Sequence, residues 1–488
     1  VVGYESEELL AARTDDEVDF LLGSSVLDGL TGPLCDELLE RTGSDAVLRA
    51  LARDNLFVIP LDARHERFRY HQLFADALRA ELHARDPGRA RALHMRASAI
   101  AGSAGDLDRA MRHALAAEEH AVAAGMLWRA MPALFTRGRR ATAERWVQAF
   151  PPGMEHRDAH LALARAWIAL HTDSERVAHW ATLAGQIGHE GVLADGSTLP
   201  TALAVIRAMV GHGGLGQVRR DAAFAYAAAP DQGVWRAVSC LLEGAALQGL
   251  GHPAEARARM EEGAIRAGGL MPSIEMQCTA WLAFAAVLEE DREVARELTA
   301  RSQSIVRDAG LEEYGTAAVS QALAALCAAW SGRLDEAREG LTQARRLLAI
   351  IRGVAPFAAV GVRLVLIRAA LAIGEPAVAA VMVREVGPFM PYVADGPVIV
   401  REVEDARRTV EAMPAEAGGA GGAGALTSAE IRILRFLPTH LSFREIGDRL
   451  HVSRFTVKSQ AMSVYRKLGV SSRSEAVDLA VSLGLVER

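Results

Sequence analysis

Two lysines stand in one short segment, VSRFTVKSQAMSVYRKL at 452–468, and no other lysine occurs in the 488 residues. If this segment is helical, one of its faces is polar and consists of Lys458, Ser459, Met462 and Arg466. Lysine and arginine side chains reach guanine acceptors or phosphates, and methionine can touch a thymine methyl group. A flexible ammonium also reaches geometries that a planar guanidinium does not. The segment therefore predicts a helix that lies in the major groove of DNA.

The elements that must position this face are predicted from their capping residues. Thr427, Ser442 and Ser472 each precede a glutamate by three residues, which is the capping-box arrangement. Ser453 caps the remaining helix without a glutamate. The expected helices are 428–437, 443–450, 454–468 and 473–483. A tight turn, LHVS, separates the second helix from the third, as in helix-turn-helix units.

The other face of the expected helix at 454–468 is apolar and must pack inward. It consists of Val457, Ala461, Val464 and Leu468. At the start of the helix, Ser453 and Arg454 lie at the positive end of the helix dipole, where they are placed to hold a phosphate.

Charge is distributed unevenly along the chain. From residue 426 to 488, ten Lys and Arg residues outnumber six Asp and Glu residues, whereas the whole chain carries a net charge of -7. A small basic module attached to a large acidic body predicts that only the module meets a polyanion. A linker separates the two parts: AEAGGAGGAGA at 415–425 has no periodic apolar pattern, so we predict a flexible linker at 413–425.

Before the linker, one pattern recurs: a turn residue, a short polar stretch and an alanine five positions on. It starts at Gly105, Gly138, Gly251, Gly332 and Gly374, with looser versions at Asp173, Gly216 and Glu290. Neighbouring starts are 33 to 43 residues apart, a spacing typical of helix-pair repeats, and this regularity argues against the alternative of chance recurrence in a chain rich in alanine and glycine. The alanine would lie where two helix backbones approach closely. The pattern predicts a TPR-like α-solenoid over 91–412.

Residues 1–90 have a different organisation. Short helices are predicted for DDEVDFLLGSSVL, GPLCDELLERTG and SDAVLRALARDN, the third with Ser44 as its N-cap. Two short strands are predicted for LFVIPLD and RFRYH, on either side of ARHE, and a further helix for QLFADALRAEL. Three helices and a two-stranded wing are typical of a winged-helix domain.

Three stretches of the C-terminal module carry a specific pattern: LTSAEIRILRFL, LSFREIGDRLHVSRFTVKSQ and VYRKLGVSSRSEAV. They resemble the DNA-binding domain of the LuxR family of transcription regulators. The resemblance implies base readers at Lys458, Ser459 and Met462, phosphate contacts at Ser453, Arg454, Arg466 and Lys467, and Thr456 as the last member of the DNA-binding set. One departure is Gln460, where the family commonly has a histidine, so no contact is assigned to that position.

The same resemblance implies an assembly. In this family the last helix pairs two domains, which predicts a homodimer on DNA with Val477, Ala480 and Val481 in its dimer face. The implied operator consists of two half-sites about one helical turn apart. The resemblance also favours an activator, with RNA polymerase as a further partner.

The N-terminal region carries a second resemblance, in FLLGSSVLDGL, LFVIPLD and YHQLFADALRAEL. These stretches are similar to the region after the ATPase in large MalT-like LuxR regulators of the STAND group. Such proteins continue with a helical-repeat sensor, which implies an unknown small-molecule or protein signal at the repeats. A winged-helix histidine contacts nucleotide in some STAND proteins, and His71 is the matching residue. In the absence of the ATPase, we expect a structural role for His71.

No Walker A motif occurs in the sequence. This motif needs a glycine-rich turn followed by lysine and a hydroxyl residue, and neither Lys458 nor Lys467 follows such a turn. Two explanations stay open: an NTPase domain precedes Val1, or the regulator has lost it. Residues 211–216, GHGGLG, lack an adjoining strand, so we expect a turn between repeats there.

Other chemistry has little support in the sequence. The four cysteines have no CxxC or metal-ligand spacing and are expected as buried thiols: Cys35, Cys240, Cys278 and Cys327. His156 and His160 are expected as surface histidines, and we predict no catalytic residue, no cofactor and no metal site. The most apolar stretch, 354–383, is interrupted by Arg363, Arg368 and Glu375. We therefore expect a soluble cytoplasmic protein with no membrane contact.

The sequence as a whole predicts a mainly α protein. Its parts are a winged-helix-like region at 1–90, a TPR-like α-solenoid at 91–412 and a four-helix LuxR-type helix-turn-helix domain at 426–488. The predicted function is that of a DNA-binding transcription regulator, which is not an enzyme and which binds double-stranded DNA. The alternative is a helical-repeat scaffold for protein interactions, whose terminal domain binds DNA weakly or only dimerises.

Overall fold

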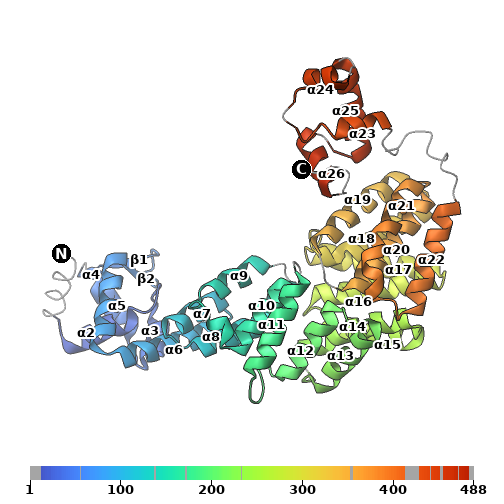
Figure 1. Cartoon of the computed structure of the whole chain (residues 1–488). Coiled ribbons are helices and arrows are strands. Elements are labelled where there is room, and N and C mark those ends of the chain that lie inside the picture. Colours follow the sequence, from blue (N-terminus) through green and yellow to red (C-terminus); the bar gives the residue numbers. More distant parts are fainter. Residues whose placement is uncertain are drawn as a thin grey trace. The chain divides into compact units, whose positions relative to one another are not determined.

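The computed structural model is largely helical (Figure 1). It describes residues 13–54, 57–136, 139–170, 173–231, 233–351, 355–412, 428–439, 441–450, 454–470 and 472–482. The predicted linker at 413–425 therefore lies outside the described residues. The chain forms two compact units, one of residues up to 210 with 221–239, and one of residues 211–220 with 240 onward.

The first unit opens with a winged helix, which confirms the predicted fold of this region. Its elements are α2 (Asp15–Ser24), α3 (Gly32–Leu39), α4 (Ser44–Arg53), β1 (Val58–Pro60), β2 (Phe68–Tyr70) and α5 (Gln72–Arg85). The two strands pair antiparallel, with Val58 opposite Tyr70 and Pro60 opposite Phe68. Leu30 exchanges two backbone hydrogen bonds with Phe68, at 2.8 and 2.9 Å, and so adds a bridge to the wing.

Large apolar side chains hold the winged helix together. Phe20, Leu38, Leu48, Phe68 and Leu78 have no exposed surface and come from three helices of the N-terminal region, the wing and α5. Because each buried side chain of this size contributes about 1.5–3 kcal/mol, this cluster is the main source of the domain's stability.

The start of α4 differs from the prediction that Ser44 is its N-cap. Gly43, with a φ of 88°, is the N-cap, and Ser44 is the first helical residue. Ser44 is fully buried, and its backbone N–H donates to Asp36 Oδ1 at 3.0 Å. A carboxylate from α3 therefore satisfies this helix start, a contact between elements that the local sequence does not reveal.

The described residues from 87 to 412 are mainly helical, and neighbouring helices along the chain pack together in pairs. Those of the first unit are α6 (Pro87–Ser103), α7 (Leu107–Ala116), α8 (His120–Thr136), α9 (Arg140–Gln148), α10 (Ala159–Ala169), α11 (Ser174–Ile187) and α12 (Leu199–Val210). Both units contribute to α13 (Leu215–Ala228) and α14 (Val234–Leu250).

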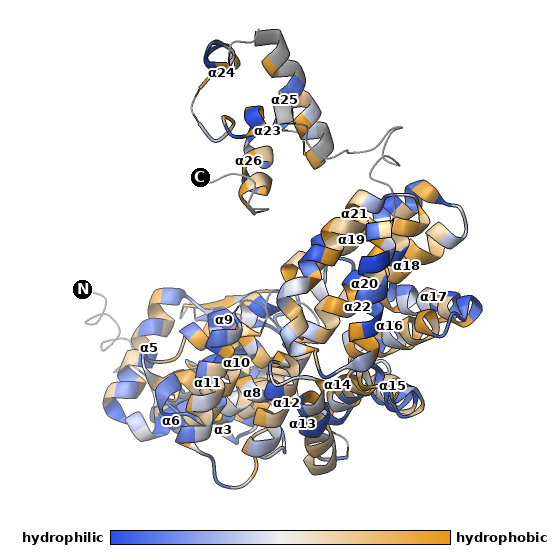
Figure 2. Ribbon diagram, turned by 45° about the vertical axis from the view of Figure 1, so that its right-hand side comes forward, coloured by the Kyte–Doolittle hydropathy of each residue, from blue (hydrophilic) through white to orange (hydrophobic). Residues whose placement is uncertain are grey.

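The second unit continues with α15 (Pro253–Ala267), α16 (Pro272–Leu288), α17 (Arg292–Asp308), α18 (Ala318–Trp330), α19 (Leu334–Ile350), α20 (Pro356–Ala372), α21 (Pro376–Val386) and α22 (Pro397–Ala412). Short 3-10 turns, η1 (Met154–His156), η2 (Gly315–Ala317) and η3 (Gly387–Tyr392), interrupt the series. Hydrophobic and hydrophilic residues alternate along most of these helices, as expected where one face is buried (Figure 2). The predicted TPR-like α-solenoid is confirmed.

The recurring turn and its alanine have the geometry that the sequence predicted. The turn glycines have φ between 74° and 89° at Gly105, Gly251, Gly332 and Gly374. The alanine five positions on is at most 1% exposed at Ala110, Ala256, Ala337 and Ala379. Glu290, with a φ of 61°, takes the glycine's place in its repeat, and Ala295 is again fully buried. Only a small side chain fits where the paired helices meet.

Two of the looser matches depart from this pattern. After Asp173 the position five on is the exposed Ala178, and after Gly216 it is Asp221. Asp221 is buried and forms an ion pair with Arg207 at 2.7 Å. These two repeats therefore have the regular spacing along the sequence but lack a small buried residue where the helices meet.

The arginines that interrupt the apolar stretch at 354–383 lie in α20 and form ion pairs. Arg363 Nε lies 3.3 Å from Glu385 Oε2, and Arg368 Nη2 lies 2.5 Å from Glu402 Oε2. None of the described helices is both long enough and apolar enough to cross a membrane.

The glycine-rich segment GHGGLG forms the turn that leads into α13, as predicted. Gly214 has a φ of 84°, and the next two backbone N–H groups, of Leu215 and Gly216, donate to the carboxylate of Asp395 at 2.9 and 2.8 Å. An added Cβ at Gly214 would lie 2.9 Å from Asp395 Oδ2, so only glycine allows this approach. The start of α13 thus holds a carboxylate of the same chain, 180 residues away.

We predict that Asp395→Ala loosens the start of α13. The substitution leaves two backbone N–H groups without their acceptor, and losing hydrogen bonds to a charged group costs about 1–3 kcal/mol. Amide hydrogen exchange in α13 should become faster. Asp335→Ala is the matched control, because the Asp335 side chain is 98% exposed. Equal exchange in both variants would show that the Asp395 contacts do not stabilise the turn.

Candidate nucleic-acid interface

The described C-terminal residues form a small helical domain with its own core. Its helices are α23 (Ser428–Leu434), α24 (Phe443–Leu450), α25 (Arg454–Leu468) and α26 (Arg473–Ser482). Four helices were predicted with nearly these bounds, except that the first ends at 434 instead of 437. The core combines residues of all four helices and of the turn after α23: Ile433, Leu434, Leu437, Ile446, Val457, Ala461, Val464, Tyr465, Ala476 and Ala480.

Two of the predicted capping residues are described, and both cap their helices. The Ser442 hydroxyl and backbone N–H each donate to Glu445 Oε2 at 2.7 Å, and the Glu445 N–H donates to Ser442 Oγ at 3.3 Å. These hydrogen bonds hold the pKa of the Glu445 carboxyl below its ordinary value. At α26, the Glu475 N–H donates to Ser472 Oγ at 3.2 Å. The caps predicted at Thr427 and Ser453 lie outside the described residues.

Helix α25 is fixed in rotation by its apolar face. Val457, Ala461 and Val464 have no exposed surface, and Leu468 packs against the same core at the end of the helix. The predicted inward face is therefore confirmed. On the other side Met462 is 55% exposed. Because Lys458 and Arg466 are four residues before and after Met462, the helical backbone places all three positions along one line.

The remaining predicted DNA contacts are described only in part. Ser453 lies outside the described residues, and so do the side chains of the others: Arg454, Thr456, Lys458, Ser459, Arg466 and Lys467. The backbone of all but Ser453 belongs to α25. Met462 is thus the one predicted contact of α25 whose side-chain exposure the described residues establish.

Arg473 joins the turn before α24 to the start of α26. Its guanidinium donates to the carbonyl oxygens of Leu437, Thr439 and Leu441, at 2.9, 2.7 and 2.8 Å, and lies over the ring of Phe443. These contacts set the position of α24, which in turn packs on α25. The sequence analysis missed this role. A signal for this role was present in the sequence. The helix dipole disfavours a cation in the first turn of a helix, so an arginine at this position indicates that its side chain binds to another part of the protein.

A second polar contact, between α23 and α25, was also missed. The Ser463 hydroxyl donates to Glu430 Oε1 at 2.8 Å, and Glu430 is only 6% exposed. A carboxylate this buried needs such donors. The bond joins positions 33 residues apart, so it too helps to set α25 against its neighbours.

Part of the predicted dimer face on α26 packs inside the domain instead of facing outward. Ala480 has no exposed surface and belongs to that core, so it offers nothing to a partner. Val477 packs partly against the core, and Val481 is half-buried. A dimer face on this helix is thus reduced to Val477 and Val481.

The histidines that the sequence singled out have structural surroundings. His71 is exposed, with its ring edge-on to Phe57. His156 is exposed beside Trp180, as predicted. The prediction of a surface position is wrong for His160, which is 8% exposed and whose Nε2 accepts the Ala194 N–H at 3.3 Å.

Within the described part of the chain, no three His, Cys, Asp or Glu side chains are grouped to hold a metal ion. The four cysteines are buried free thiols, as predicted. Burial raises the pKa of Cys35 and Cys240 to about 12, which keeps both protonated at neutral pH and therefore poor nucleophiles.

Two protein families match parts of this chain. The MalT winged helix domain matches residues 6–90, and the bacterial regulatory proteins of the luxR family match residues 424–480. These are the winged helix of the first unit and the helical domain built on α23 to α26.

Two relatives share about a third of the chain. The HTH-type transcriptional regulator MalT of Vibrio cholerae is 29% identical over 166 residues, which are 34% of this chain and 18% of that protein. The serine/threonine-protein kinase PknK of Mycobacterium tuberculosis is 33% identical over 164 residues, which are 34% of this chain and 15% of that protein. The chain therefore matches less than a fifth of the length of either relative.

A solved structure shares the fold. It is a Signal Transduction ATPase with Numerous Domains (STAND) protein with a tetratricopeptide repeat sensor, from Pyrococcus horikoshii. The TM-score is 0.52 at 12% identity, and the match covers 86% of this chain and 63% of that one. The chain thus combines a match to the MalT winged helix domain, TPR-like repeats and a match to the luxR family, and in these parts it is similar to MalT-like proteins of the LuxR type.

We predict that Arg473→Ala opens the turn between α23 and α24. The carbonyl oxygens of the turn lose their donor, which costs about 1–3 kcal/mol or five- to 150-fold in the closed-to-open ratio. Limited proteolysis of the full chain between residues 435 and 442 should accelerate by that factor. Arg473→Lys should accelerate cleavage less, since it keeps one donor group. The exposed Arg432→Ala is the control, and a similar acceleration there would contradict the assigned role.

Proposed function

We propose that this chain is a DNA-binding transcription regulator. The observation that carries the proposal is the packing of α24 and α25 as a helix-turn-helix. The second helix buries Val457, Ala461 and Val464 and exposes Met462, in a domain that matches the luxR family. A helix held in this way is free to lie in the major groove.

The proposal assigns roles along α25. Lys458, Ser459 and Met462 read base edges, by hydrogen bonds and by contact with a thymine methyl group. The phosphate contacts come from Ser453, Arg454, Arg466 and Lys467, and Thr456 completes the set. The basic balance of residues 426–488 supports this assignment, since phosphate contacts supply most of the affinity for DNA.

Two copies of the chain bind together in this proposal. Val477 and Val481 of α26 form the dimer face, and the operator has two half-sites about one helical turn apart. The repeats receive a small-molecule or protein signal, and the regulator activates transcription through contact with RNA polymerase. In this mechanism, binding of the signal changes how copies of the chain assemble, and no chemical step is involved. The similarity to the Vibrio cholerae transcriptional regulator MalT supports this class of function.

Kinase activity is not proposed from the other relative. The segment shared with the kinase PknK is only 15% of that protein, and the family matches of this chain are a winged helix and a luxR domain.

The test is selection of bound duplexes from a random pool by the full chain, followed by sequencing. Enrichment of one inverted repeat supports the proposal and identifies the operator. Affinity for that repeat should fall by about 0.9 log units per phosphate contact for each log unit of salt. If no sequence is enriched and a labelled duplex binds without salt dependence, the scaffold alternative replaces the regulator.

We predict that Lys458→Ala weakens binding to the selected operator by about 1–3 kcal/mol and relaxes its sequence preference at one position. The physical reason is the loss of a donor to guanine acceptors. Fluorescence anisotropy on operator and random duplexes measures both affinities. Arg432→Ala, exposed on α23, is the control of equal charge. Equal losses on both duplexes would make Lys458 a phosphate contact instead.

We predict that Val481→Asp abolishes cooperative binding to paired half-sites. A carboxylate in the dimer face repels its copy and cannot be desolvated cheaply. Because Val481 is only half-buried, the domain should remain folded, which circular dichroism checks. Binding to one half-site should be unchanged. Unchanged cooperativity on the paired site would remove α26 as the dimer face.

A further inference from the structure

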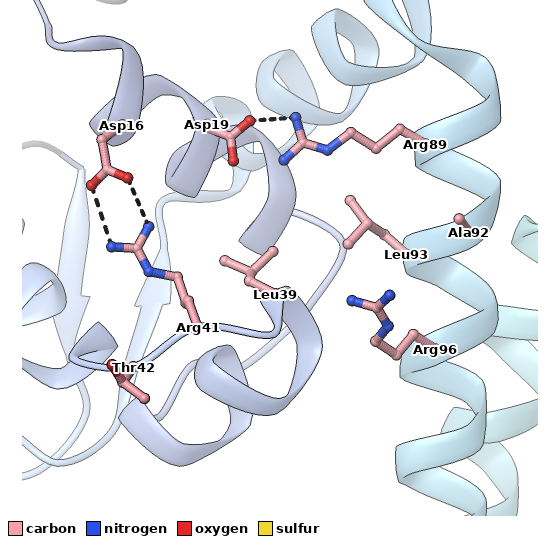
Figure 3. Close-up of a pocket in the computed structure, with 9 residues that line it drawn as sticks. All are labelled: Asp16, Asp19, Leu39, Arg41, Thr42, Arg89, Ala92, Leu93 and Arg96. Atoms are coloured by element: carbon pink, nitrogen blue, oxygen red, sulfur yellow. Dashed lines mark hydrogen bonds and ion pairs between the residues drawn. The ribbon is translucent and has the colours of Figure 1, made fainter.

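A cavity of about 640 Å³ lies in the first unit, beside the winged helix (Figure 3). One wall is α6, which presents Arg89, Leu93 and Arg96 at the spacing of a single helix face. The other wall is the end of α3 and the segment after it, with Leu39 and Arg41. A cavity of this volume suits a small organic ligand.

Three guanidinium groups border the cavity, and each is oriented by the protein. Arg41 donates to both carboxylate oxygens of Asp16 at 3.3 Å, and Arg89 donates to Asp19 at 2.5 Å (Figure 3). Arg96 donates to the Leu38 carbonyl oxygen at 2.7 Å and pairs with Glu40 at 3.2 Å. The arginines are thus held in place before any ligand arrives.

The carboxylates that pair with Arg41 and Arg96 are weak competitors for these two arginines, whereas Arg89 is paired with Asp19 at 2.5 Å. The Asp16 and Glu40 side chains are 73% and 74% exposed, whereas the Arg41 side chain is 25% exposed. Ion pairs with such exposed partners contribute little, because water screens them. The two Arg41 contacts are also longer than the usual 2.7–2.9 Å of a charge-assisted bond. An incoming anion can therefore replace Asp16 on Arg41 at small cost.

Apolar groups lie between the arginines. Leu39 and Leu93 approach each other across the cavity, between Arg41 on one side and Arg89 and Arg96 on the other (Figure 3). Gly23 of α2 backs this wall, since an added Cβ there would lie 2.6 Å from Leu39 Cδ2. The site combines cations at its edge with an apolar floor, so it suits a molecule with an anionic end and a compact carbon skeleton.

The backbone turns sharply beside Arg41. Glu40 is the C-cap of α3 with a φ of 53°, the left-handed conformation in which helices commonly end. Here the turn at Glu40 separates the helical Leu39 from Arg41, and both residues line the cavity.

We propose that this cavity is a binding site for an organic phosphate. A phosphate group offers three acceptor oxygens, so it can accept hydrogen bonds from guanidinium groups on both walls. The two parallel N–H donors of a guanidinium group match two of these oxygens. The carbon skeleton rests on Leu39 and Leu93. The site lies in the winged helix and α6 and does not depend on the proposed DNA binding.

The test is calorimetric titration of the full chain with glucose 6-phosphate, a nucleoside diphosphate, pyrophosphate and citrate. Unphosphorylated glucose is the matched neutral ligand. An organic phosphate should bind saturably, at least about tenfold tighter than its neutral parent, and less tightly as salt rises. Citrate tests whether a carboxylate serves as well as a phosphate, and pyrophosphate tests whether the carbon skeleton contributes.

Variants locate the binding. Arg41→Ala and Arg96→Ala should each weaken it by about ten- to a hundredfold, and Arg41→Lys by less, since it keeps the charge but loses the fork. Arg49→Ala is the control, because Arg49 forms an exposed ion pair with Asp45 on α4, outside the cavity. Melting of each variant without ligand checks that it is folded.

Three results would overturn the proposal. One is the absence of saturable binding by any of the anions at millimolar concentration. Another is equal binding of glucose and glucose 6-phosphate, which would exclude anion recognition. The third is equal loss in the Arg41→Ala and Arg49→Ala variants, which would mean general attraction to arginines of the surface.

Discussion

Close approach of neighbouring helix backbones is the constraint on which the repeats of this protein depend. At five of the recurring turns the alanine that follows is buried, because a larger side chain would not fit where the two helices meet. Within the second unit the same limit appears between helices: an added Cβ at Gly340 would lie 2.9 Å from Ala325 Cβ, and one at Gly361 would lie 2.5 Å from Trp281 Cη2. Small residues therefore set the distance between helices, and the larger apolar side chains fill the space that remains.

The C-terminal domain uses packing for a different purpose, which is to set the rotation of one helix. One face of α25 is held in the core by Val457, Ala461 and Val464. Arg473, at the start of α26, fixes the turn before α24, the helix that packs on α25. The proposed contact with DNA requires that the opposite face, with Met462, stays outside. A loss of this rotational control would affect binding as much as the loss of a contact residue.

Two helix starts illustrate how the protein manages charge. The start of α13 is closed by Asp395 of the same chain, so its backbone N–H groups are already satisfied. The start of α25 is proposed to meet a phosphate of DNA. Around the winged helix, arginines are instead oriented by exposed carboxylates, which water screens and an anion can replace. Charged and backbone N–H groups thus either stabilise the fold or remain able to bind a ligand, depending on how deeply their partners are buried.

The sequence by itself determined the features that have local causes. Caps at Ser442 and Ser472, the turn glycines with their alanines, the two strands of the wing and the inward face of α25 follow from spacing over a few residues. The tertiary structure alone decided that Asp36 caps α4, that Arg473 donates to the turn before α24, that Ala480 is buried and that a cavity lies beside α6. It also decided the contact of Asp395 with the start of α13, 180 residues away along the chain. Such residues come into contact only after the helices have packed, and local periodicity carries no information about these contacts.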